Sequence, residues 1–355
     1  MRRERVFSGV MIPKTWPGSL QKISFQGLVR ALTLPAVLVA ASAMLAQTCL
    51  SSADMDAATK TALENTARRY FDMTSKGDVF NLKQNAIPSL AANFSGVEAA
   101  VVDNKAAFTG AQANPRPPFL LKAEGSAPLP HAEFLCGVFG ATGQTRDSAI
   151  FVLNGLPPGT YGVVIMDVTG AKGPYTLSFI LQQMGTDWKL GGFYAKPASV
   201  AGHDAPWYLE QARQYKAKGQ LHNAWLYFQQ GRSLVSPLDF MTTLQTDKLY
   251  DEMQAAQPKD VPAAGAPADL VAGGKTYKLT SMFPLAVGNE LDLIVKYEVP
   301  DISNSTQTFQ DNMAVIKALV SKYPELREAF AGVVARAVEP SGRDYGSLLA
   351  MKDIK

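Results

Sequence analysis

The chain has 355 residues, of which 47% are hydrophobic and 18% are charged, and its formal net charge is +3. This length suits two or three domains, and the composition is that of a globular protein with ample material for a core. The excess positive charge comes from the first 46 residues, so the rest of the chain offers no basic field for nucleic acid, and we expect no nucleic-acid partner.

The first 46 residues combine basic side chains with an apolar run. The basic residues are Arg2, Arg3, Arg5, Lys14, Lys22 and Arg30, and the apolar run extends from Ala31 to Ala46. At about 16 residues, the run is shorter than the roughly 20 that span a bilayer. Small residues between Ala41 and Ala46 suit cleavage, so we predict that residues 1–46 are a signal peptide and that the protein is exported to the periplasm or the cell exterior. The alternative is an uncleaved segment that anchors the protein in the membrane.

The predicted signal takes six of the 34 basic residues and one of the 31 acidic ones, so 28 basic and 30 acidic residues remain. Only Cys49 and Cys136 occur as cysteines. Alternation around Cys136 places it on one strand face with Phe134 and Val138, which predicts a buried core thiol. A Cys49–Cys136 disulfide is an alternative that export would permit, and lipidation of Cys49 is another.

The region 54–197 begins with helical patterns. Asp54 or Asp56 can cap a helix that ends at Gly77, and the spacing from Ser95 to Glu98 is that of a capping box. Six strand patterns follow, separated by Pro- and Gly-rich turns. They are 119–123, 133–139, 148–153, 161–168, 175–183 and 188–194. Helices followed by antiparallel strands predict an α+β fold.

The opening helix with Tyr70-Phe71 and Gly77-Asp78, together with the closing strand Trp188 to Tyr194, resembles the cystatin-like cone of nuclear-transport-factor and ketosteroid-isomerase relatives. The resemblance implies a curved sheet and helices around a pocket for a small ligand or for acid–base catalysis. The segment Phe151 to Tyr161 is similar to the strand–turn–strand of transthyretin-like β-sandwiches, which is the alternative fold. Asp72 and Asp167 are the carboxylates that could act in such a pocket, although both positions are typical of solvated residues.

The region 203–256 predicts a helical hairpin and a further helix. Aromatic and small residues recur at helical spacing from Trp207 to Gly231, with a break at Gly219, and the segment resembles a single tetratricopeptide repeat. Since a repeat array needs about three units, we expect the hairpin to pack on a neighbouring domain or to present a peptide-docking surface. The Pro- and Gly-rich segment 257–274 predicts a linker.

The region 275–355 predicts a small α+β domain in the order β-β-α-β-β. Its helix, 306–322, carries a stripe made by Phe309, Met313, Ile316 and Val320, which predicts a buried face. Gly274-Lys275-Thr276 resembles part of a phosphate-binding loop, but a strand pattern follows instead of a helix, so we expect no phosphate site.

Known catalytic and metal motifs are missing from the sequence. The three histidines are His131, His203 and His222, and none lies in a motif typical of zinc, redox, serine-hydrolase or nicotinamide chemistry. Alternation directs Cys136 away from His131 and Glu133, so we expect neither a metal nor a cofactor. Catalytic residues cannot be assigned from the sequence.

These patterns lead to the hypothesis of an exported, non-enzymatic module that binds a protein partner through the hairpin or a small apolar ligand. The alternatives are an isomerase- or hydrolase-like enzyme that uses a carboxylate in the cone pocket, and a structural assembly protein.

Overall fold

The computed structural model describes residues 47–139, 143–170, 172–263 and 265–355. The predicted signal, residues 1–46, lies outside them. The chain divides into two compact units with a boundary between Lys196 and Pro197, and each unit is α+β. No helix of the described residues has the length and apolarity that crossing a bilayer requires.

The first unit contains five helices and eight strands within its described residues. Its helices are α1 (Ala57–Lys76), α2 (Val79–Gln84), α3 (Pro88–Ala92), α4 (Ser95–Asp103) and α5 (Lys105–Phe108). Its strands are β1 (Gln47–Leu50), β2 (Gln112–Pro115), β3 (Phe119–Ala123), β4 (Leu129–Cys136), β5 (Ala149–Leu156), β6 (Gly159–Gly170), β7 (Gly173–Met184) and β8 (Asp187–Pro197). All six strand patterns found in the sequence correspond to strands, whereas β1 and β2 had no sequence signal.

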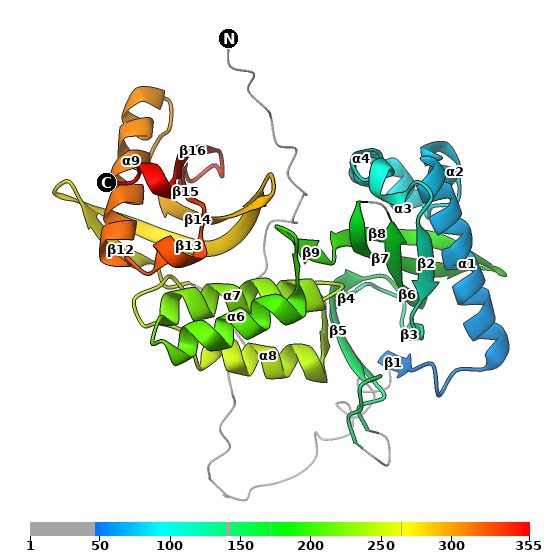
Figure 1. Cartoon of the computed structure of the whole chain (residues 1–355). Helices are drawn as coiled ribbons and strands as arrows, with labels where there is room; N and C mark the ends of the chain where they lie inside the picture. The colour runs from blue at the N-terminus through cyan, green and yellow to red at the C-terminus, as the bar shows by residue number, and fades with distance from the viewer. Residues whose placement is uncertain (1–46, 140–142, 171, 264) are drawn as a thin grey trace, which may run out of the picture. The chain divides into compact units, whose positions relative to one another are not determined.

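The main sheet of this unit has the order β1-β3-β6-β7-β8, with β2 also paired to β6. The long hairpin β6–β7 forms its centre, and α1 lies along the sheet (Figure 1). Leu63 and Tyr70 of α1 are fully buried in one apolar cluster with Val164 and Phe179 of the sheet. The helices therefore cover this face of the sheet and fill the space beside it.

Local signals explain the limits of α1. The side chain of Asp56 accepts a hydrogen bond from the Thr59 backbone N–H at 2.8 Å, which makes Asp56 the N-cap. Gly77 ends the helix in the left-handed conformation, at φ 69°. The predicted capping box at Ser95 is wrong, because α4 begins at Ser95 itself and its N-cap, Phe94, has no side-chain hydrogen bond.

Cys49 and Cys136 form a disulfide with a Cα–Cα distance of 4.9 Å. The prediction of a free core thiol at Cys136 is therefore wrong, and the alternative of a disulfide is correct. The reason is β1, a four-residue strand that pairs with β3 and brings Cys49 beside β4. Disulfides are typical of proteins that fold in an oxidising compartment.

The second unit contains a helical hairpin, a further helix and a five-stranded sheet. Its helices are α6 (Ala205–Ala217), α7 (Leu221–Val235), α8 (Leu244–Gln254), α9 (Ser305–Lys322) and α10 (Leu326–Ala329), followed at the end by the 3₁₀ helix Met351–Asp353. Its strands are β9 (Ser199–Val200), β10 (His203–Asp204), β11 (Met241–Thr243), β12 (Ala268–Ala272), β13 (Lys275–Val287), β14 (Glu290–Glu298), β15 (Gly332–Val338) and β16 (Asp344–Ala350). The predicted β-β-α-β-β order is present from β13 to β16, and β12 lies inside the segment predicted to be a linker.

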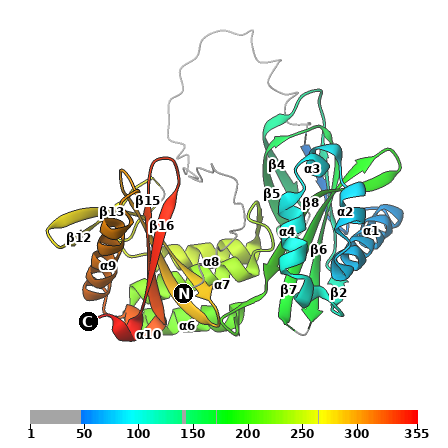
Figure 2. The same cartoon turned by 90° about the horizontal axis from the view of Figure 1, so that it is seen from above.

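The large sheet of the second unit has the order β12-β13-β14-β15-β16. Only β14 and β15 are parallel among the paired strands of this sheet, and the chain passes from one to the other through α9. Figure 2 shows α9 beside the sheet, and Figure 1 and Figure 2 both show α6, α7 and α8 lying together.

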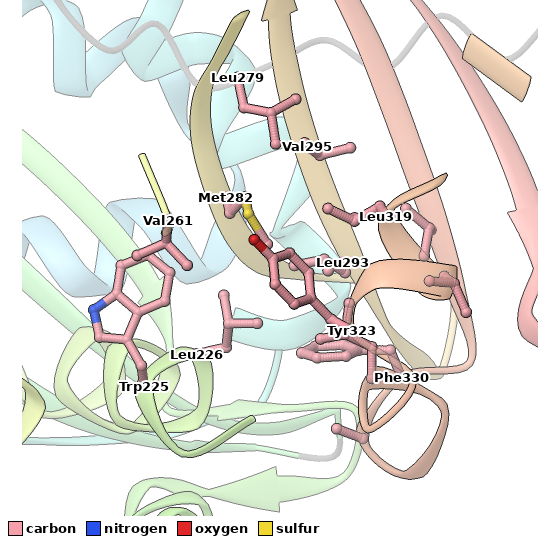
Figure 3. Packing of buried hydrophobic residues seen from close by; sticks show 14 of the residues in the cluster. Trp225, Leu226, Val261, Leu279, Met282, Leu293, Val295, Leu319, Tyr323 and Phe330 are labelled. Carbon is pink, nitrogen blue, oxygen red and sulfur yellow. The ribbon is translucent and has the colours of Figure 1, made fainter. Parts of the chain in front are cut away.

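One face of this sheet is covered by α7 and α9 together. Leu293 and Val295, which alternate along β14, belong to the same buried cluster as Leu226 of α7 and Leu319 of α9 (Figure 3). The hairpin and the sheet therefore share one core. The predicted stripe of α9 is buried at Ile316 and Val320, but Phe309, in the first turns of the helix, is 49% exposed.

Candidate functional site

The two candidate carboxylates from the sequence lie on the surface of the first unit. Asp72 is exposed and forms an ion pair with Lys76 at 2.7 Å. Asp167 is exposed and accepts hydrogen bonds from both Nε and Nη2 of Arg116. Both are the solvated residues that their sequence positions suggest, and the structure does not bring them into a pocket.

The covered face of the first unit's sheet is packed with side chains. Tyr70, Phe108 and Phe179 are fully buried there, and the Tyr70 hydroxyl donates to the carbonyl oxygens of Asn85 and Trp188. The buried polar residues of the described part of this unit are serines and threonines, with no carboxylate among them. Among its described residues, this interior therefore offers no carboxylate for the catalytic alternative.

The remaining motifs from the sequence also have structural roles. His131 and Glu133 are exposed on the face of β4 opposite Cys136, as alternation predicts, and His131 contacts the Asn154 side chain at 3.1 Å. Lys275 lies at the start of β13, and its Nζ is 3.1 Å from a carboxylate oxygen of Asp311. The described residues contain no group of three side chains that could hold a metal ion.

The second unit contains a cavity of about 310 Å³ between the helical hairpin and the sheet. Its walls come from four places: the turn before α6, the two hairpin helices, the β13–β14 turn with the start of β14, and α10 with the segment that follows it. The lining residues are Ala201, His203, Trp207, Tyr208, Tyr227, Asn289, Glu290, Leu291, Glu328, Ala329, Phe330 and Ala331. We refer to this space as the hairpin cavity.

Aromatic rings form much of the wall of the hairpin cavity. The ring centroids of Trp207 and Tyr208 are 5.0 Å apart with nearly perpendicular planes, and those of Tyr227 and Phe330 are 5.9 Å apart. His203 stacks on Trp207 at 3.6 Å with an interplanar angle of 9°. Edge-to-face packing of this kind fixes the ring positions, so the wall is built before any ligand arrives.

The tyrosine hydroxyls of this wall are engaged with the protein's own backbone. Tyr208 donates to the carbonyl oxygen of Val200 at 2.9 Å, and Tyr227 donates to that of Ala329 at 2.7 Å. Burial raises the pKa of Tyr208 to about 12 and raises the pKa of Tyr227 further above its ordinary value. Both hydroxyls therefore stay protonated, and the two residues line the cavity as largely buried rings, 1% and 5% exposed.

Two carboxylates lie among the lining residues. Glu328 accepts a hydrogen bond from Nε2 of Gln220 at 2.9 Å and is 3.6 Å from Nζ of Lys218. Glu290, the first residue of β14, is exposed and makes no ion pair within the described part of the chain. Asp292, two residues further along β14, is only 4% exposed, and burial and the charge of Glu290 raise its pKa.

The third histidine lies in a separate polar cluster. The ring nitrogens of His222 are 2.6 Å from a carboxylate oxygen of Glu325 and 3.0 Å from one of Asp260. The ring also packs on Tyr323 at a centroid distance of 4.0 Å. Burial opposes ionisation of Asp260, but the hydrogen bonds from His222 and Tyr323 and the charge of His222 together outweigh it, and the pKa of Asp260 is lowered. This cluster ties α7 to the segment after α8 and to the start of α10, which is a structural role.

Comparison of the chain with protein-family models, characterised proteins and solved structures finds no match. The case for a site therefore depends on geometry alone. Trp207 and Tyr208 were part of the hairpin pattern in the sequence, but Glu290, Glu328 and Phe330 were not singled out. They lie about 80 to 125 residues away from Trp207 and Tyr208 along the chain, so no short motif could have joined them.

Proposed function

We propose that this protein is an exported, non-enzymatic binding module whose ligand site is the hairpin cavity. The observation that carries the proposal is a preformed aromatic wall around open space, with carboxylates among its lining residues. Binding sites are commonly concave, largely apolar and equipped with a few polar groups, and volumes begin near about 300 Å³. The ligand is either a small molecule or one side chain of a protein partner of the hairpin.

Export is part of the proposal. The basic and apolar pattern of residues 1–46 and the Cys49–Cys136 disulfide both support it. The proposed location is the periplasm or the cell exterior, with membrane anchoring by residues 1–46 as the alternative. For the first unit we propose the cystatin-like cone, supported by a long helix that lies along a mainly antiparallel sheet. Its packed interior suits a structural role better than a catalytic one.

A fragment screen on the full chain tests the proposal, with binding detected as a rise in Tm and as a change in tryptophan fluorescence. Ligands that bind the native state raise its stability in proportion to concentration. We expect hits with wild-type protein that disappear in Ala331→Phe, which fills the cavity from its lining. Leu348→Phe, an exposed site in the same unit, is the matched control and should keep them. A screen without hits, or hits that persist in Ala331→Phe, would refute the cavity as the binding site.

A further inference from the structure

The groups that line the hairpin cavity have few hydrogen-bond donors to offer. The two tyrosine hydroxyls donate to backbone carbonyls, as described above. The backbone N–H of Phe330 donates to Leu326 O at 3.1 Å, and that of Ala331 donates to Leu291 O at 2.9 Å. Among the lining side chains without a formal charge, His203, Asn289 and the indole N–H of Trp207 remain as donors, so a ligand rich in acceptors would find few partners here.

The charges at the cavity have one sign when the histidine is neutral. Glu290 and Glu328 are the charged residues of the lining, and neither lysine nor arginine is among the lining residues. Lys218 approaches Glu328 from outside the lining and partly compensates it. Glu290 is left as the uncompensated carboxylate. An anionic ligand would meet this charge without a cation to balance it, whereas a cationic ligand would be attracted.

Aromatic rings attract the same kind of ligand. The faces of tryptophan, tyrosine and phenylalanine carry negative potential, and they bind ammonium and quaternary ammonium groups. Trp207, Tyr208, Tyr227 and Phe330 are four such rings among the residues that line this space together with Glu290, and Trp207 is the most exposed of the four. We infer that the hairpin cavity binds a small organic cation, an alkylammonium or quaternary ammonium group, and this inference rests on the proposed function of the cavity.

The size of the cavity limits the ligand. A space of about 310 Å³ lies at the lower end of the range for small-molecule sites. It holds one small cation or the end of one basic side chain. The organic cation can therefore be a free metabolite or the side chain of a lysine in a protein partner. The experiment distinguishes these two sources.

The experiment compares pairs of probes that differ in charge and not in shape, by calorimetry on the full chain. Choline is paired with its neutral isostere 3,3-dimethylbutan-1-ol. The peptide acetyl-Gly-Lys-Gly-amide is paired with the same peptide carrying norleucine in place of lysine. We expect the cation of at least one pair to bind at least tenfold more tightly than its neutral partner. Preference for choline identifies a free cation, and preference for the lysine peptide identifies a protein side chain.

A charge-removing variant checks that the cavity is the place of binding. Glu290→Gln should weaken binding of the cation about fivefold, the upper range for an exposed ion pair, and leave the neutral isostere unchanged. Glu298→Gln, an exposed position at the other end of the same strand, should change neither. A purely structural role of Glu290 would weaken both members of a pair equally.

The results distinguish this inference from the proposed function. Equal affinity for the cation and its isostere, tighter binding of the isostere, or no binding by all four probes would overturn the organic-cation inference. The proposed function would survive those results as long as other fragments bind wild-type protein and not Ala331→Phe. Only the fragment screen would refute the proposed function, by giving no hits or hits that persist in Ala331→Phe.

Discussion

Both units bury tyrosines against a sheet and direct their hydroxyls to backbone carbonyls. In the first unit, Tyr70 of α1 does so at the face of the sheet that the helices cover. Leu63 of the same helix packs so closely on β6 that a Cβ on Gly162 would lie 2.2 Å from its side chain. In the second unit, Tyr208 and Tyr227 do the same, yet open space remains beside them. The walls of that space include turns, such as the one at Asn289, and not only interlocking helix and strand side chains. Hydrogen-bonded tyrosine hydroxyls are therefore not enough to leave a core without open space.

Removing the disulfide should give the largest difference in stability between the two units, because only the first unit contains a disulfide. In Cys49→Ala/Cys136→Ala, the chain-entropy model for a crosslink across 87 residues predicts a loss of about 4.6 kcal/mol in the stability of the first unit. Hydrogen exchange measured by mass spectrometry should show faster exchange in β3 and β6, with unchanged exchange in α7 and β14.

Reduction of wild-type protein with dithiothreitol is the control and should give the same pattern. Equal loss of protection in both units would show that they do not have independent stability. No loss in either would show that β1 contributes little to the first unit.

A pair of helical glycines tests how tightly each unit's helices are packed. A Cβ on Gly231 of α7 would lie 2.6 Å from Cδ2 and 2.8 Å from Cγ of Leu209, so Gly231→Ala should cost about 1–3 kcal/mol by overpacking the hairpin. A Cβ on Gly96 of α4 would meet nothing within 4 Å, so Gly96→Ala should stabilise the first unit by about 0.5–1 kcal/mol. Urea unfolding of the two variants measures both effects. A neutral Gly231→Ala would mean that the hairpin helices can move apart, which would weaken the argument for a rigid cavity wall.

The smallest expected effect concerns Asp292, which with Glu339 is one of two buried carboxylates among the described residues of the second unit, whereas the described interior of the first unit has none. The pKa of Asp292 is raised in the folded state, so the unfolded chain ionises first and folding opposes the charge at neutral pH. Asp292→Asn should therefore increase stability at pH 7 by on the order of 0.5 kcal/mol. The gain should shrink as the pH falls through the raised pKa of the folded state, and it should vanish below the ordinary carboxyl pKa, where both states are protonated. Urea midpoints at several pH values measure it, and a gain independent of pH would assign the effect to the amide and not to the charge.

Periodic patterns identified most of the regular structure. Predicted strand 119–123 matches β3, and predicted helix 306–322 matches α9 within one residue. Short elements were missed because their stability comes from tertiary contacts. The clearest case is β1, whose four residues carry no pattern of their own, and missing it led to the wrong prediction for Cys136.

Less of the candidate site than of the fold could be predicted from the sequence. The helical pattern identified Trp207 and Tyr208, but the other side of the cavity depends on how the β13–β14 turn and the end of α10 return to the hairpin. That arrangement follows from the order of the sheet, in which β15 lies parallel to β14. A parallel pair joins segments separated by a whole helix, and no local spacing reports it.

The disulfide also determines how the chain would bear a mechanical load. It joins β1 to β4 and not to β3, the strand with which β1 exchanges hydrogen bonds. Tension applied ahead of residue 47 would pass through the sulfur atoms into the β4–β5 hairpin, so the β1–β3 pair could not be unzipped one bond at a time beyond Cys49. A tether at that end, whether a membrane segment or an experimental handle, would pull on a covalent loop instead of a free strand.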